Sequence, residues 1–220
     1  MNLKYILAAG AIFFSCIVSS QTLAGGKPYN SAGVRAYNSS GPVGGGYMEA
    51  RGVVVPNAAE VKWILRTAQQ GDASAQFNMA LRYDNGQGVP QDQAESVKWL
   101  RKAAEQGFVE AQYNLACMYD SSEGVSQDHA EVAIWFRKAA ESGFASAQKN
   151  LGAKYGNGLG VAQSDAEAYL WSSIAANSGD EGAISNRDFA ASKLSPEELE
   201  LAQRRATELN SEIQQRVADS

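Results

Sequence analysis

Tryptophan marks a single fixed interval along this chain. The four tryptophans stand 36 residues apart, at Trp63, Trp99, Trp135 and Trp171. Glycine keeps the same interval at Gly71, Gly107, Gly143 and Gly179. A self-similar period of about 20 to 50 residues is the signature of repeat architectures, in which each unit buries its apolar face against its neighbours. The chain is therefore expected to fold as a stack of similar units.

Each unit is predicted to contain two helices. In the first helix, Ala111, Leu115 and Tyr119 are four residues apart and lie on one helical face. This helix ends at a turn containing glycine, written "NGQGV", "SSEGV" and "NGLGV" in successive units. Glycine just past a helix end adopts the left-handed conformation that other residues resist.

The second helix begins with a predicted capping box. Its N-cap positions are Asp92, Asp128 and Ser164, and a glutamate follows each of them three residues later. On this helix Ala94, Trp99 and Ala103 are expected to face the core. Arg101, Lys102 and Glu105 are expected to face water. One such helix pair cannot bury its apolar face alone, which predicts an all-α stack of antiparallel helix pairs.

These residues resemble a known family. The segments "AQYNLACMYDSSEGV" and "HAEVAIWFRKAAESG" are similar to the Sel1-like repeat, a relative of the tetratricopeptide repeat. The resemblance extends from Ala58 to about Lys193, and it implies a right-handed α-solenoid that contacts other proteins. The solenoid is expected over residues 57–194, opening with a lone second helix. Its full repeats are expected at about 72–107, 108–143 and 144–179.

The C-terminal segment 195–220 leaves the repeat pattern and is predicted to form a capping helix. Ser195 is its expected N-cap, Pro196 its first helical residue and Glu198 the partner in a capping box. One face of this helix is apolar and the rest is charged, as an end cap requires. The apolar stripe consists of Leu199, Ala202, Ala206, Leu209 and Ile213.

The N-terminal residues are expected to direct export. Lys4 precedes an apolar run, and small residues end it, which predicts a signal peptide over 1–24 with cleavage after Ala24. The protein would then be periplasmic or secreted in a bacterial cell envelope. Cys16 offers an alternative, lipidation at a lipobox-like "FFSC". Residues 25–56, rich in Gly, Ser and Tyr, are predicted to form a flexible linker.

Composition and motifs argue against catalysis, cofactors and nucleic acid. The net charge of -5 is the wrong sign for nucleic-acid binding. His129 is the single histidine and does not suffice for a zinc site with Cys117, so no metal is expected. Ser146 and Lys149 fit S-x-x-K, but the partner motifs of β-lactam enzymes are missing. A cell-envelope enzyme acting on β-lactams or peptidoglycan remains the alternative function.

The expected function is that of a non-catalytic adaptor. Its binding residues are expected among the positions that differ from repeat to repeat. On the first helix, the face opposite the core changes from unit to unit while the core residues are copied. By resemblance to tetratricopeptide arrays this face lines a concave groove that binds a protein or peptide, and we expect a monomer. For Phe77, Leu81 and Cys117, packing between repeats is the alternative explanation. The candidate groove residues are Phe77, Leu81, Asp84, Tyr113, Cys117, Asp120 and Lys149.

Overall fold

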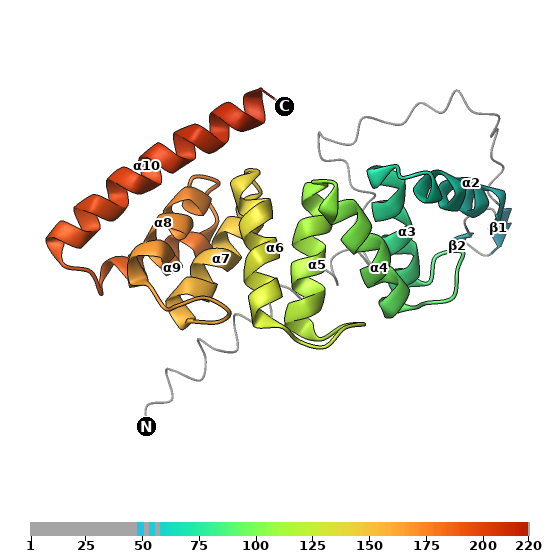
Figure 1. The fold of residues 1–220 in the computed structure, drawn as a ribbon, viewed down its shortest axis with the longest axis horizontal. Helices are drawn as coiled ribbons and strands as arrows, with labels where there is room; N and C mark the ends of the chain where they lie inside the picture. Colours follow the sequence, from blue (N-terminus) through green and yellow to red (C-terminus); the bar gives the residue numbers. More distant parts are fainter. Residues whose placement is uncertain (1–47, 51–52, 56–57, 220) are drawn as a thin grey trace. The chain divides into compact units, whose positions relative to one another are not determined.

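The computed structural model describes residues 48–50, 53–55 and 58–219, all inside the unit Tyr47–Ser220. Figure 1 shows helices α2 to α10 following one another in sequence order within this unit. The first- and second-helix pattern predicted above is present in the described residues. The helices are α2 (Ala58–Gln69), α3 (Ala73–Asn85), α4 (Gln93–Glu105), α5 (Val109–Ser121), α6 (His129–Glu141), α7 (Ala145–Asn157), α8 (Asp165–Ala176), α9 (Glu181–Ala191) and α10 (Pro196–Ala218).

Two short strands precede the helices. Strand β1 (Met48–Ala50) pairs antiparallel with β2 (Val53–Val55), and Met48 lies opposite Val55. Both strands fall inside the segment 25–56 that was predicted to be a linker. The remainder of that segment and the predicted signal peptide 1–24 lie outside the described residues. Among the helices that are described, none is both long and apolar enough to cross a membrane.

The three predicted repeats are the pairs α3–α4, α5–α6 and α7–α8, and α2 is the lone second helix. Each helix packs on the next one along the chain, so the core runs through the stack. Trp99, Trp135 and Trp171 are buried at 7%, 4% and 2% exposure, which confirms them as core residues. Trp63 on α2 is 39% exposed, because a terminal helix has a neighbour on only one side.

The turns between first and second helices are held by two left-handed positions. The first is the helix C-cap, filled by Gly86, Ser122 and Gly158 at φ 67°, 63° and 66°. The second is a glycine two residues later, and at Gly124 and Gly160 the backbone of the preceding unit approaches closely. A Cβ at Gly160 would lie 1.8 Å from the carbonyl oxygen of His129. The second glycine is therefore required by contact between repeats as well as by its turn.

The predicted caps form, but the capping boxes of the repeats are only half made. The side chain of Asp92 accepts from the backbone N–H of Glu95, at 3.0 Å. The glutamates are used elsewhere: Glu95 pairs with Lys98, and Glu131 accepts from Trp135 Nε1 at 2.7 Å. Both halves of the box are present only at α10, among the described helices. Ala94 was expected in the core and is exposed, because it lies in the first turn of α4.

A buried glutamine in each first helix links it to the helix before. Gln76, Gln112 and Gln148 are 5%, 6% and 4% exposed. Their side-chain amides donate to the carbonyls of Ala68, Ala104 and Ala140, each at 3.1 Å. Carbonyls in the last turn of a helix have no partner within that helix, and a buried one is costly to leave unpaired. Each of these carbonyls also accepts from the backbone N–H of the glycine that follows its helix, so the glutamine adds a second hydrogen bond that joins one repeat to the next.

Helix α10 closes the stack, as the apolar stripe predicted. It packs on α8, with Ala202, Ala206 and Ile213 buried. Ile174 on α8 is 4% exposed there, whereas its counterparts in the earlier repeats are lysines. The loss of basic residues from the third repeat is therefore explained by the cover that α10 provides.

Candidate functional site

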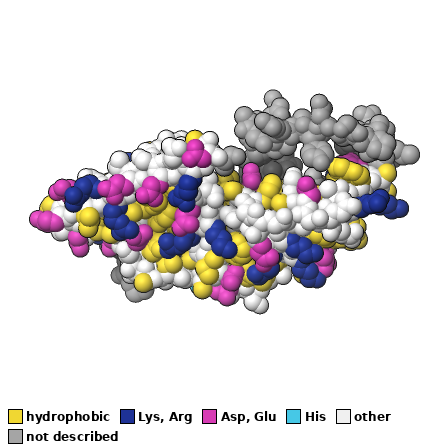
Figure 2. Space-filling view, turned by 45° about the horizontal axis from the view of Figure 1, so that its top comes forward, with side chains coloured by type: hydrophobic (Ala, Val, Ile, Leu, Met, Phe, Trp, Pro, Cys, Tyr) yellow, Lys and Arg dark blue, Asp and Glu magenta, His cyan; other side chains and the backbone are white. Residues whose placement is uncertain are grey.

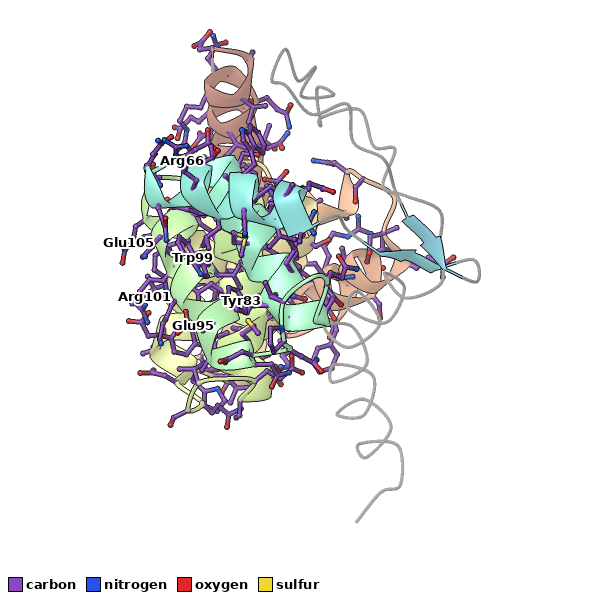
Figure 3. The ribbon with its side chains drawn as sticks, turned by 90° about the vertical axis from the view of Figure 1, so that its right-hand side faces the viewer. Arg66, Tyr83, Glu95, Trp99, Arg101 and Glu105 are labelled. Carbon is purple, nitrogen blue, oxygen red and sulfur yellow. The ribbon has the colours of Figure 1, made fainter. Side chains whose placement is uncertain are left out.

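The basic residues that follow Trp99 contact aromatic rings of the repeats themselves. Arg101 donates to the hydroxyl of Tyr119 in the next repeat, and its guanidinium carbon lies 5.6 Å from that ring's centre. Lys102 Nζ lies 4.1 Å from the centre of the Trp99 ring. Figure 3 shows Arg101 at the margin of α4 beside Glu105, while Tyr83 lies further in. The expectation that Arg101 and Lys102 merely face water was incomplete, because both contact aromatic rings.

One column of candidate residues clamps successive first helices together. Phe77 stacks on Phe108, the N-cap residue of α5, with ring centres 5.0 Å apart. One repeat later, Tyr113 contacts Phe144, the N-cap residue of α7, at 4.9 Å. Tyr113 also lies 5.7 Å from Phe136 and is buried at 7% exposure. Phe77 and Tyr113 thus serve contact between repeats.

The third member of this column replaces the aromatic pair with an ion pair. Lys149 Nζ lies 2.9 Å from Asp180 Oδ2, and Asp180 is the N-cap of α9. The hydrogen bond from Lys149 lowers the pKa of Asp180, outweighing the opposing effect of burial. The partner positions Phe108, Phe144 and Asp180 were not singled out from the sequence, although they follow the same interval of 36 residues.

Asp84 and Asp120 stand at the same place in successive repeats, and Asp120 is paired with a cation. Asp120 Oδ1 accepts from Lys154 Nζ at 2.6 Å, and the lysine side chain is only 7% exposed. His129 Nδ1 lies 4.0 Å from the same oxygen. Asp120 therefore already has a cation, supplied by the first helix of the next repeat. Its assignment as a partner-binding residue is weakened by this ion pair.

Asp84, one repeat earlier, has the opposite environment. The position equivalent to Lys154 is occupied by Met118, which is buried at 6% exposure. Burial raises the pKa of the Asp84 carboxyl, and the negative charge of Glu123 raises it further. No ion pair or side-chain hydrogen bond to this carboxylate is found among the described residues. Asp84 is the candidate residue whose charge the fold does not use.

The apolar column is the most open. Leu81 and Cys117 are half-buried, as is Ala153 after them. Phe189 continues the column on α9 and is 62% exposed, with Lys193 Nζ 4.4 Å from its ring centre. A single exposed apolar side chain is common on protein surfaces, so Phe189 extends the column without by itself marking a contact surface. Phe189 was not among the candidates from the sequence, although it stands one interval of 36 residues after Ala153.

In the S-x-x-K motif the lysine is paired with a residue other than Ser146. Lys149 is committed to Asp180, and no hydrogen bond joins it to Ser146 within the described part of the chain. The structure shows no group of three or more metal-ligating side chains among the residues it describes. Figure 2 shows basic and acidic side chains interspersed over the surface in view, with no large block of one sign.

Comparisons with known proteins agree with this architecture. The family profile described as Sel1 repeat matches residues 73–108, 109–144 and 145–180. The chain is similar to a protective antigen present in uropathogenic Escherichia coli strains and displaying an SLR fold. The identity is 33%, the TM-score 0.64, and the match covers 74% of this chain and 35% of that one.

A second solved structure is similar over nearly its whole length. It is a Sel1 repeat protein from Oxalobacter formigenes, 39% identical, with a TM-score of 0.55, and the match covers 59% of this chain and 97% of that one. Among curated proteins no match is found. With three helix pairs in one register, matched repeat by repeat, the chain belongs to the Sel1 repeat family.

Proposed function

We propose that this protein is an exported, non-catalytic scaffold that binds a protein or peptide partner on the exposed face of its first helices, α3, α5, α7 and α9. Sel1 repeats are protein-interaction modules, and this supports a protein partner. The observation that carries the site is the unneutralised carboxylate of Asp84. Burial and the charge of Glu123 destabilise the ionised form of Asp84, and a cation that binds beside it would stabilise that form.

The internal repeat indicates which chemistry fits Asp84. At the equivalent place one repeat later, the ammonium group of Lys154 lies 2.6 Å from Asp120. Arg82 in the first repeat likewise reaches back to Glu60, at 2.7 Å. Arg82, Met118 and Lys154 stand at the same place in the three repeats. Of these, only Met118 supplies no cation to the unit before it. A lysine or arginine of the partner would complete the pattern at Asp84.

The proposal is tested by partner capture from a cell-envelope extract with matched variants. Asp84→Lys replaces attraction by repulsion, and Met118→Lys offers Asp84 an internal cation as Lys154 does for Asp120. We expect both variants to lose at least tenfold in captured partner, while Glu105→Lys, on the exposed side of α4, captures as the wild type does. Equal capture by all four proteins would exclude Asp84 from the binding site.

Stability measurements separate binding from folding. Asp84→Lys removes a desolvated like-charge contact with Glu123, so its melting temperature is expected to equal or exceed that of the wild type. Asp120→Lys leaves the buried Lys154 unpaired and adds a second cation, so it should lower the melting temperature. A lower melting temperature for Asp84→Lys would mean that its loss of capture reflects unfolding.

Export is proposed from the N-terminal sequence. Expression of the full chain in a bacterium, followed by fractionation and N-terminal sequencing, tests it directly. Cleavage after Ala24 in the envelope fraction is the expected result. An intact Met1 in the cytoplasmic fraction would contradict export, and a lipid-modified Cys16 would replace the soluble form with an anchored one.

A further inference from the structure

Helix α10 is joined to the stack by a small apolar contact. It has 23 residues, of which Ala202, Ala206 and Ile213 are buried. Two of these three are alanines, so docking removes little apolar surface of α10 from water. Helix α8, on which α10 packs, already has its own first helix, α7. We call α10 the strap, because it is added to a complete repeat.

The far end of the strap meets the turn between α6 and α7. A Cβ placed on Gly143 would lie 3.1 Å from Val217 Cγ2 and 3.5 Å from Ile213 Cγ2. Gly107 and Gly179 stand at the same place in other repeats, and a Cβ there would meet nothing within 4 Å. Figure 1 shows α10 running from α8 toward α6. The strap therefore bridges the second and third repeats.

An ion pair joins the strap to the first turn of α8. Arg205 Nη2 lies 3.1 Å from Glu167 Oε1. The arginine side chain is 53% exposed and the glutamate side chain 24%. Such a pair stabilises little, because water screens the two charges and both side chains must be ordered.

The same ion pair occupies the acceptor that Trp171 would use. In the second repeat, Trp135 Nε1 donates to Glu131 Oε2 at 2.7 Å. Glu167 is the equivalent of Glu131 and stands four residues before Trp171. Trp171 Nε1 is nevertheless buried without a hydrogen-bond partner among the described residues, a costly arrangement. When the strap leaves, Glu167 loses Arg205 and becomes free to accept from Trp171, so the ion pair adds little net stability to docking.

The opposing force is an apolar face on α8. Leu170 and Ile174 are buried, whereas their counterparts Ile134 and Lys138 on α6 are exposed. The difference arises because α8 is covered by the strap. Release of the strap would expose Leu170 and Ile174 to water, which favours the docked position.

We propose that α10 is a releasable strap: it is docked on α8 in a closed form, and it detaches in an open form in which Glu167 accepts the hydrogen bond of Trp171. The repeats stay folded in both forms. Burial of the apolar face of α8 favours the closed form, and the exchange of partners at Glu167 reduces the cost of the open form. Opening uncovers α8 and frees the α6–α7 turn. It goes beyond the proposed function, since it uses none of the residues assigned to partner binding.

The strap is tested by hydrogen exchange of backbone amides in the full chain, followed by mass spectrometry. Amides of α10 between Ala202 and Ile213 are compared with amides of α5, at the centre of the stack. A released helix exchanges quickly, because an isolated helix is only partly formed in water. We expect exchange in α10 to be at least about a hundredfold faster than in α5. Equal exchange would overturn the strap, because α10 would then open only when the whole stack unfolds.

Two pairs of variants test the attachments. Arg205→Gln removes the ion pair and should speed exchange in α10 by about threefold to tenfold, whereas Arg204→Gln, at an exposed neighbour, should leave it unchanged. Gly143→Ala and Gly107→Ala impose the same left-handed strain, at φ 86° and 89°. Only the alanine at position 143 meets the strap, so only this variant should speed exchange in α10. Equal exchange within either pair would overturn that attachment.

The exchange of partners at Glu167 has its own signature. The indole N–H proton of Trp171 is followed by nuclear magnetic resonance and compared with that of Trp135, which is hydrogen-bonded. In Arg205→Gln the Trp171 resonance should move downfield toward that of Trp135. An unchanged resonance would overturn the role of Glu167. None of these outcomes bears on Asp84, which the capture experiment tests separately.

Discussion

Replacement of Trp135 by alanine tests whether the repeated tryptophan holds the stack together. Its side chain is 4% exposed in α6, at the centre of the stack. Burial of an aromatic side chain removes about 150–250 Å² from water, which corresponds to about 4–6 kcal/mol at about 25 cal/mol per Å². Because alanine retains part of that burial, we expect Trp135→Ala to lower the free energy of unfolding by about 3–5 kcal/mol.

Trp63 is the matched control, since it has the same place in the repeat. It is 39% exposed, so it buries about two thirds as much of its surface as Trp135 does. The same conversion predicts a loss of about 2–3 kcal/mol for Trp63→Ala. Urea unfolding followed by circular dichroism at the helix band is the suitable assay, because fluorescence would change with every tryptophan removed.

Two results would refute this reasoning. A loss below about 1 kcal/mol for Trp135→Ala would show that the ring is not packed in the core. A loss for Trp63→Ala equal to that for Trp135→Ala would show that burial does not set the cost. A change in the slope of the unfolding curve would indicate separate unfolding of the repeats, and the two losses would then be compared by hydrogen exchange.

Three further predictions concern individual contacts. Ser122 has a left-handed backbone at φ 63°, so Ser122→Gly should stabilise the protein by about 1 kcal/mol in thermal unfolding, whereas Ser122→Ala should bring no gain. Gly160→Ala should abolish or severely weaken folding, because its Cβ would lie 1.8 Å from a backbone oxygen of α6, and Gly107→Ala, with nothing within 4 Å, should cost only about 1 kcal/mol. Lys149 lowers the pKa of Asp180 below its ordinary value of 3.8, so the ion pair stabilises the fold above that pH and is lost as pH falls below it. The melting temperature of Lys149→Met should therefore fall less than that of the wild type between about pH 6 and about pH 3, and parallel curves would contradict the assignment.

The repeat interval was sufficient to predict the architecture. A period of 36 residues with tryptophan, glycine and alanine in phase indicates helix pairs, because only regular stacking requires the same residue at the same place in each unit. The N-termini of helices could also be predicted from the sequence. Asp92 caps α4 and Ser195 caps α10 as predicted, since a cap depends on residues within one turn.

The candidate site was harder to predict, because exposure and pairing depend on residues far along the chain. Phe77 and Tyr113 were expected to meet a partner, but Phe108 and Phe144 of the following repeats contact them. Asp84 and Asp120 look equivalent in the sequence. Only the positions of Met118 and Lys154 make one carboxylate unneutralised and the other paired.

The sequence by itself determined the repeat, the helix pairs, their caps and the closing helix, because each depends on short-range periodicity or on neighbours within a turn. The tertiary structure decided which faces of those helices meet another repeat. That contact assigned Lys149 to Asp180 and closed the apolar face of α8 beneath α10. It also left the Asp84 carboxylate without a cation, because Met118 stands where Lys154 stands one repeat later.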